Sequence, residues 1–195
     1  MKFEQQLFEI KAVSKKGADY ARFEIGPLNH GYGHTLGVAL RRVLLSSLPG
    51  AAITEVKIAG VRHQFSTLKG MDKDIVSFVL GLKKVRLSFS GEKPEKITLS
   101  VKGPKTVLAS DMKMPATVKL ANPDLVLANL SKGAKLEAEI LVESGFGYLS
   151  VEEREVEQIG TIPVDAIFSP ILRVNYEIEE TRVGRLTNYD KLIPI

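Results

Sequence analysis

Three glycines and the helix predicted after them form the part of this sequence whose residue types most suggest chemistry. The stretch GYGHTLGVALRRVLLSSLPG runs from Gly31 to Gly50 and follows the strand-like segment ARFEIGPL. Backbone amides of a glycine-rich loop at a helix N-terminus can hold a phosphate. One hypothesis is therefore a small phosphate- or nucleotide-binding enzyme that uses the Gly31–Gly37 loop.

The spacing of these glycines argues against a phosphate site. Gly31, Gly33 and Gly37 read G-x-G-x-x-x-G, which is one residue longer than the dinucleotide fingerprint, and the Gly-Lys-Ser/Thr ending of a P-loop does not follow. The next segments read as short strands without crossover helices, so no βαβ unit is predicted. The other interpretation is that the glycines permit a tight turn and close packing of the backbone.

The remaining titratable side chains do not form a recognisable catalytic or metal-binding set. His30, His34 and His63 lack the spacing of metal ligands, and His34 is interpreted as a turn or capping contact. The carboxylates of EEREVE, residues 152–157, are interpreted as a solvated face. The chain has no cysteine, which excludes disulfides and thiol catalysis. We therefore predict no catalytic residue, no cofactor and no metal site.

The predicted helix has apolar residues on two sides. At 100° per residue, a broad apolar face contains Leu36, Ala39, Leu40, Val43, Leu44 and Leu48. Val38 and Leu45 fall on the opposite side, flanked by Arg41 and Arg42. Arginine is favoured at protein interfaces, so this second side is either a protein contact or a solvated surface with two half-exposed apolar residues.

The elements around this helix predict a mixed fold. The segment 72–82 is predicted to be a short helix capped by Asp72, and 52–61 with 63–67 is predicted to be a hairpin. In the last segment Leu172, Val174, Tyr176 and Ile178 alternate with polar residues, which predicts a strand with one buried face. Further strands are predicted at 7–13, 20–28, 84–90, 96–103, 116–123, 125–130 and 135–144, and after the Ser169–Pro170 break at 171–183.

Composition and segment order predict the fold class and the kind of partner. The chain has 195 residues, a hydrophobic fraction of 44% and 27 basic against 23 acidic residues that are interspersed along the sequence. It has no run of about 18 apolar residues and no signal-peptide pattern, so no membrane span is predicted. The mild charge favours a protein partner over a nucleic acid. We predict an α+β fold with a discontinuous domain, 1–49 plus 170–195, and a β-rich insert, 50–169.

Two long motifs closely resemble one protein family. The segment FEIGPLNHGYGHTLGVALRRVLLSSLPG, with the residues that follow it, and DAIFSPILRVNYEIEETRVGRLTNYDKLI resemble the N-terminal domain of the bacterial or plastid DNA-directed RNA polymerase alpha subunit. The resemblance covers roughly residues 5–193. It implies a non-catalytic subunit of a nucleotidyltransferase that dimerises, through helices on a small antiparallel sheet, and scaffolds assembly of the beta and beta-prime subunits. It also implies a location in the bacterial cytoplasm, at the nucleoid, or in the plastid stroma.

The resemblance also assigns roles to individual residues. The beta contact is carried by Arg42 and Leu45, with Arg41 and Val38 beside them; Val38 stands where the family usually has Asn. Contacts with beta-prime or the large subunits are implied for Lys83, Val164, Ile171 and Lys191. The family continues beyond YDKLIPI into a helix, a linker and a promoter-binding domain, so no direct DNA contact is assigned to this chain. The turn and helix of the dimer region comprise Gly31, Gly33, His34, Thr35, Leu36, Gly37, Leu40 and Leu44.

Overall fold

The chain divides into two compact units in the computed structural model, which describes residues 9–13, 20–91, 93–153 and 160–195. Unit 1 comprises Met1–Ser47 and Ile171–Ile195, and unit 2 comprises Leu48–Pro170. Helices and antiparallel sheets occur together, which confirms the predicted α+β class. No helix in the described part of the chain is long and apolar enough to cross a membrane.

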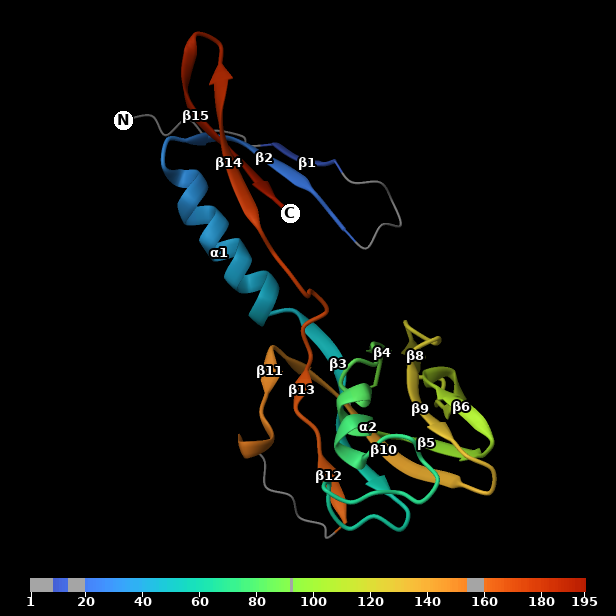
Figure 1. The fold of residues 1–195 in the computed structure, drawn as a ribbon. Helices are drawn as coiled ribbons and strands as arrows, with labels where there is room; N and C mark the ends of the chain where they lie inside the picture. The colour runs from blue at the N-terminus through green and yellow to red at the C-terminus, as the bar shows by residue number, and fades with distance from the viewer. Residues whose placement is uncertain (1–8, 14–19, 92, 154–159) are drawn as a thin grey trace. The chain divides into compact units, whose positions relative to one another are not determined.

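Unit 1 is a four-stranded antiparallel sheet with one helix packed on it (Figure 1). The strand order is β1-β2-β15-β14, so the two inner strands come from opposite ends of the chain. The helix α1, Tyr32–Ser46, contacts β15, β14 and β2. The strands are β1 (Glu9–Ala12), β2 (Phe23–Asn29), β14 (Tyr176–Val183) and β15 (Leu186–Pro194).

Unit 2 is built on a seven-stranded antiparallel sheet with a large apolar core. Along β5, Ile97, Leu99 and Val101 are buried while the residues between them are exposed, which is the period of a half-buried strand. The order is β7-β5-β10-β3-β4-β8, and β12 also pairs with β3. These strands are β3 (Pro49–Ile58), β4 (Leu87–Phe89), β5 (Glu95–Lys102), β7 (Met112–Lys113), β8 (Val118–Leu120), β10 (Lys135–Phe146) and β12 (Thr161–Pro163).

Smaller elements cover the sheet of unit 2. The helix α2, Ile75–Leu82, buries Ile75, Phe78 and Leu82 and contacts β9. Two short ribbons are formed by β6 (Lys105–Leu108) with β9 (Val126–Leu130) and by β11 (Tyr148–Leu149) with β13 (Ala166–Ile167). Two 3₁₀ turns, η1 (Ala109–Asp111) and η2 (Val151–Glu153), complete the unit.

Two predictions about the start of unit 2 were wrong. Residues 63–67 form no strand, and β3 pairs instead with β10, β4 and β12. The cap of α2 is Asp74, whose Oδ1 accepts from the Ser77 amide at 2.9 Å. Asp72 instead accepts from the backbone and side chain of Asn129 at 2.7 and 2.8 Å. The carboxylate that bonds the amide three residues ahead is the one that caps the helix.

The strand predicted after the Ser169–Pro170 break begins later than expected, at Tyr176. Residues 168–175 are not in a strand, and Leu172 is 73% exposed, so its predicted burial was wrong. Val174 is buried, and Tyr176 and Ile178 pack against the core of unit 1, as the alternation predicted. The central strand β15 was not predicted, because Thr187, Asn188 and Tyr189 lack a clear apolar alternation with their neighbours.

Candidate functional site

The N-terminus of α1 is capped by a residue from the far end of the chain. Gly31, the cap residue, has φ 82° and no side chain that could accept a hydrogen bond. Asp190 of β15 takes that role: its Oδ2 accepts from the Gly31 amide at 2.8 Å and from the Gly33 amide at 3.1 Å. Asp190 is 5% exposed. The cap therefore joins the helix to the central strand of its sheet.

This arrangement bears directly on the phosphate hypothesis. The amides of Gly31 and Gly33 are the groups that a glycine-rich loop would offer to a phosphate. Both already donate to the carboxylate of Asp190, which supplies a negative charge at the positive end of the helix. The loop thus has the chemistry of an anion site, and its anion belongs to the protein. Sequence reasoning missed Asp190, since no local pattern marks a partner 157 residues away.

The face of α1 that packs on the sheet is narrower than predicted. Gly33 and Gly37 are buried and lie closest to the sheet, with Leu36 and Leu40 packed beside them against Ile25, Leu28 and Leu192. The ring of His34 meets the ring of Tyr176 edge to face, with centroids 6.5 Å apart. His34 was predicted to make a turn or capping contact, but the carboxylate that caps α1 is Asp190, and His34 contacts the ring of Tyr176. The interpretation of the glycines as positions of close packing is confirmed at Gly33 and Gly37.

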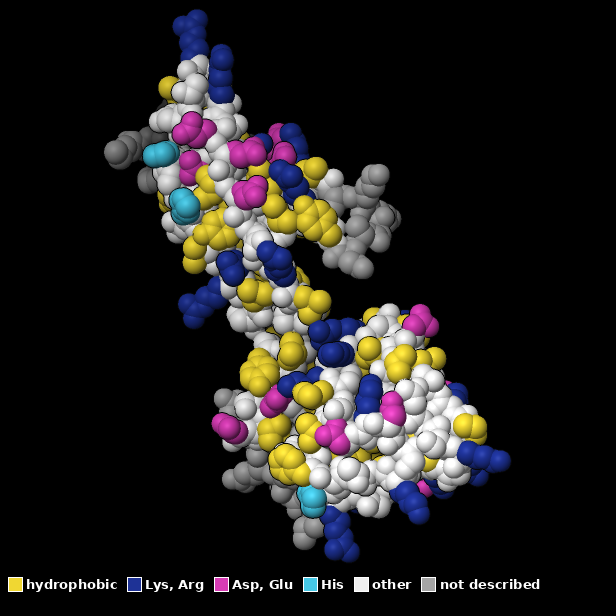
Figure 2. Space-filling view, in the orientation of Figure 1, with side chains coloured by type: hydrophobic (Ala, Val, Ile, Leu, Met, Phe, Trp, Pro, Cys, Tyr) yellow, Lys and Arg dark blue, Asp and Glu magenta, His cyan; other side chains and the backbone are white. Residues whose placement is uncertain are grey.

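The opposite side of α1 is exposed and carries the predicted contact residues. Arg42 lies about half a turn away from the Gly33–Gly37 line, and Val38 is 58% exposed. Val43 is 50% exposed and Ala39 is also exposed, so their predicted burial was wrong; the two glycines, which allow the closest approach, set the roll of the helix. Leu45 is half-buried. Figure 2 shows basic and apolar side chains next to one another over this helix.

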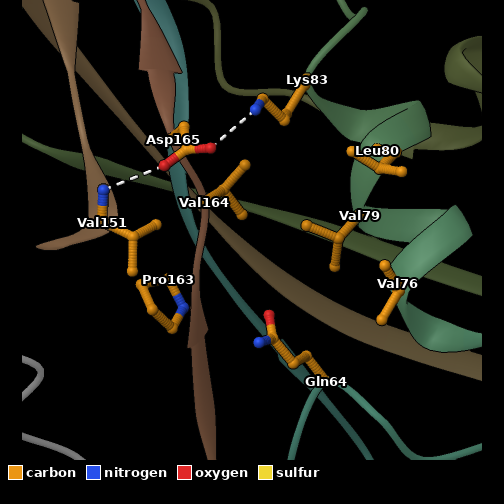
Figure 3. A pocket seen from close by; sticks show the side chains of 9 residues that line it. All are labelled: Gln64, Val76, Val79, Leu80, Lys83, Val151, Pro163, Val164 and Asp165. Carbon is orange, nitrogen blue, oxygen red and sulfur yellow. Dashed lines mark hydrogen bonds and ion pairs between the residues drawn. The ribbon is translucent and has the colours of Figure 1, made fainter.

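A second group of predicted contact residues lies in unit 2, beside a small cavity (Figure 3). Lys83, just after α2, donates from Nζ to Asp165 Oδ2 at 2.7 Å, and the other carboxylate oxygen of Asp165 accepts from the Val151 amide at 3.0 Å. These two hydrogen bonds, that from Lys83 first, hold the pKa of Asp165 below its ordinary value. Val164 is 1% exposed and lines the cavity with its side chain.

The cavity is too small for most metabolites. Its volume is about 110 Å³, whereas small-molecule sites in proteins typically measure roughly 300 Å³ or more. The wall from α2 is apolar and the Lys83–Asp165 ion pair closes one end. The remaining wall residues are Gln64, Val76, Val79, Leu80, Val151 and Pro163. The dimensions and lining suit a single side chain of a protein partner.

The other two predicted large-subunit positions belong to unit 1. Ile171 is half-buried at the start of the C-terminal segment. Lys191 faces Glu179 across the β14–β15 pair, with Nζ 2.6 Å from Oε2. This hydrogen bond raises the pKa of Lys191 and lowers that of Glu179. The structure therefore brings Lys83 and Val164 together and places Ile171 and Lys191 in the other unit.

Metal-ligating side chains do not cluster in the part of the chain that the structure describes. No group of three or more His, Asp or Glu residues there could hold a metal ion. His63 Nδ1 lies 3.2 Å from the hydroxyl of Ser66, and His30 Nδ1 lies 3.5 Å from Asp190 Oδ1. Each of these histidines therefore has a local polar neighbour.

Comparison with known proteins gives one family and closely similar relatives. Residues 56–169 match the family described as "RNA polymerase Rpb3/RpoA insert domain". The chain is 50% identical over 176 residues to the DNA-directed RNA polymerase subunit alpha of Herpetosiphon aurantiacus, covering 90% of this chain and 53% of that protein.

Two further relatives bear the same description. The subunit alpha of Syntrophomonas wolfei is 49% identical over 187 residues, covering 94% of this chain and 59% of that protein. The subunit alpha of Clostridium kluyveri is 44% identical over 194 residues, covering 98% of this chain and 61% of that protein. The chain thus spans little more than half the length of the curated relatives it matches.

Proposed function

The chain belongs to the RNA polymerase Rpb3/RpoA insert-domain family, and on that premise we propose that it is the N-terminal region of the alpha subunit of a DNA-directed RNA polymerase. In this role it forms a homodimer and scaffolds assembly of the beta and beta-prime subunits for DNA-templated transcription. It contributes to a nucleotidyltransferase without supplying catalytic residues. Its place of action is the bacterial cytoplasm, at the nucleoid, or the plastid stroma.

The two units receive different parts of this function. We assign the dimerisation and assembly domain, 1–49 plus 170–195, to the sheet that carries α1. We assign the insert, 50–169, to the seven-stranded unit, and the family match over residues 56–169 supports this assignment. A rigid sheet under α1 suits a docking helix, because a binding surface on a packed element keeps its geometry.

The observation that supports the beta contact is the exposed side of α1. Arg42 lies opposite the packed glycines and next to exposed Val38, with Leu45 half-buried one turn on. An exposed apolar strip with arginine beside it is suited to a protein interface, where the guanidinium can make bidentate bonds. We assign Arg42 and Leu45 as the main beta contacts, with Arg41 and Val38 at their side.

Support for the second large-subunit contact is the cavity beside Lys83. Lys83 and Val164 line one small cavity, which is open to receive an apolar side chain next to an ion pair. We assign this cavity to beta-prime. Ile171 and Lys191 are assigned to the same partner on unit 1, where Lys191 is already oriented by Glu179.

Co-purification with the beta subunit tests the proposal. Arg42 is exposed and Arg42→Ala leaves the helix intact, so the fold measured by circular dichroism should not change. Loss of an interface arginine typically costs about 2 kcal/mol, or roughly thirtyfold in affinity. Arg62→Ala is the control, since Arg62 is an exposed arginine of unit 2 that lies outside the proposed contacts. Equal capture of beta by the wild type and Arg42→Ala would remove the assignment.

A nucleotide titration separates this proposal from the phosphate-binding alternative. Because Asp190 already accepts from Gly31 and Gly33, we expect no saturable heat when ATP or GTP is added to the protein. Saturable binding that is weakened by a Gly33 substitution would favour the enzyme instead.

A further inference from the structure

The hydrogen bonds that cap α1 join residues that are far apart in the sequence. In an ordinary N-cap the accepting side chain comes from the residue just before the helix, so the bond orders the helix within itself. Here the cap residue is a glycine and the acceptor is Asp190, which is 157 and 159 positions away from the two donors. Such a bond fixes where the helix begins relative to β15. Its length and direction therefore set the axial position of α1 on the sheet.

The absence of a side chain at Gly33 leaves room for the Asp190 carboxylate beside α1. A Cβ built on Gly33 would lie 3.1 Å from Asp190 Oδ2 and 3.2 Å from Ile178 Cγ2. Glycine at this position is thus what allows the carboxylate to reach the amide. Asp190 is 5% exposed, so the charge is withdrawn from water and depends on these donors for its stabilisation. The loop, the helix end and the carboxylate form one complementary set.

The strand β15 carries a second functional candidate next to this carboxylate. Successive residues of a strand point to opposite faces of its sheet. Asp190 and Leu192 face α1, and Lys191 between them bonds Glu179 at 2.6 Å. Two adjacent residues of β15 are therefore involved in the candidate contacts: Asp190 bonds the helix that carries Arg42, and Lys191 is itself a candidate contact residue.

We propose that Asp190 is a positioning residue: an internal anion that occupies the glycine-rich anion cradle of α1 and thereby sets the place of the Arg42 helix on the sheet. The role in subunit capture rests on the proposed function, whereas the internal anion does not. The glycines resemble those of a phosphate-binding loop because this loop also binds an anion, which is the carboxylate of Asp190. Asp190 also lies 3.5 Å from His30 Nδ1, and its bonds to the helix are those from the Gly31 and Gly33 amides.

Chemical rescue tests the internal anion directly. In the full-length chain, Asp190→Ala should move the amide proton resonances of Gly31 and Gly33 away from their hydrogen-bonded positions. Sodium formate, a carboxylate small enough for the vacated space, should return both resonances toward the wild type. Asp190→Asn keeps an acceptor oxygen without the charge and should give an intermediate position. Glu177→Ala, which removes an exposed carboxylate from β14, should show no response to formate.

Binding of the beta subunit tests the positioning role. Loss of a helix cap at this end is expected to weaken capture by Asp190→Ala about tenfold, and formate should recover most of that loss. Chloride at the same ionic strength serves as the control for salt. A formate response in the amide signals with no change in beta affinity would overturn the positioning role. Amide signals that formate does not restore would overturn the internal anion.

Three further outcomes are decisive. If Asp190→Ala does not fold, Asp190→Asn replaces it, and its Gly31 and Gly33 amide resonances and its affinity for beta are measured without formate. Amide resonances equal to those of the wild type would contradict the need for charge. If inorganic phosphate shifts Gly31 and Gly33 in the wild type, the cradle is open to external anions and the proposal is wrong. If the wild type binds no beta subunit, the proposed function fails while the formate response still decides the internal anion.

Discussion

Gly37 packs directly against the ring of Tyr176. A Cβ built on Gly37 would lie 2.6 Å from Tyr176 Cδ2 and 2.8 Å from Cε2, closer than real side-chain contacts allow. The absence of a side chain at this helix position therefore lets α1 approach β14 closely, and the neighbouring leucines reach the core on either side. The distance between the helix and the sheet is set by this pair.

We accordingly expect Gly37→Ala to destabilise the protein although alanine favours helices. Overpacking of this kind typically costs about 1–3 kcal/mol, more than the gain of roughly 1 kcal/mol in helix propensity. Urea unfolding measures the change. Val38→Ala, on the exposed side of the same helix, is the matched control and should change stability little. If Gly37→Ala is as stable as the wild type, the ring does not limit the approach of α1.

The Lys83–Asp165 pair predicts a particular pH dependence. The folded-state pKa of Asp165 is lowered, so the pair's contribution to stability is present above the ordinary aspartate pKa near 3.8 and is lost as pH falls through the lower folded value. The difference in unfolding free energy between wild type and Asp165→Asn should therefore be constant above about pH 5 and shrink below about pH 4.

A more exposed ion pair provides the control for that measurement. Lys96 and Glu139 lie 3.6 Å apart with side chains that are 72% and 58% exposed, so Glu139→Gln should change stability little at any pH. An equal pH dependence for both variants would show that Asp165 gains nothing from Lys83. A shift in the opposite direction would contradict the lowered pKa.

The two aspartates before α2 should behave differently on substitution. Asp74→Ala removes the cap of the helix that forms one wall of the cavity, and the expected cost is about 1 kcal/mol. Amide hydrogen exchange should then rise at the first turn of α2. Asp72→Ala should instead raise exchange at Asn129 on β9, whose amide donates to Asp72. Faster exchange at α2 with Asp72→Ala alone would restore Asp72 as the cap.

Self-association is predicted to use the edge of α1 at Val43, about 100° around the helix from Arg42. Val43 is 50% exposed on this helix, and a carboxylate at that position would have to be desolvated in a dimer. Val43→Asp should therefore shift the protein from dimer to monomer in sedimentation velocity at about 10 µM while circular dichroism stays unchanged. Val126→Asp, at a 45% exposed position of unit 2, should leave the dimer intact. Dimers that persist in Val43→Asp would place the contact elsewhere.

Local patterns predicted most of the regular elements but not their partners. The strand at 96–103 was predicted well because Ile97, Leu99 and Val101 alternate with polar residues, and this signal is contained in the segment. The strand β15 was missed because its place between β2 and β14 depends on pairing with distant strands. The residues at 187–189 lack the apolar alternation that would indicate a strand. Asp190 was missed for the same reason. The helix was predicted, while its roll depended on Tyr176, which lies far along the chain.

The candidate contact residues were predicted from resemblance more than from pattern. The wheel of α1 placed Val38 and Arg42 away from the packed face correctly, because angular position follows from helix geometry alone. Helix geometry alone does not show how much of the broad apolar face the sheet covers, so the prediction that Val43 is buried was wrong. The joining of Lys83 with Asp165, which lies 82 residues away, has no sequence signal in either segment.

The place of β15 in the sheet has a consequence during synthesis on the ribosome. The strands of unit 2 all lie within 48–170, so this unit can close as soon as that stretch has emerged. The first sheet cannot, since β15 is the last of its four strands to be made, and α1 lacks its cap and the part of its packing surface formed by β14 and β15 until residue 190 arrives. The middle of the chain therefore matures before its beginning, and a nascent chain stalled before β15 displays the glycine face of α1 to chaperones.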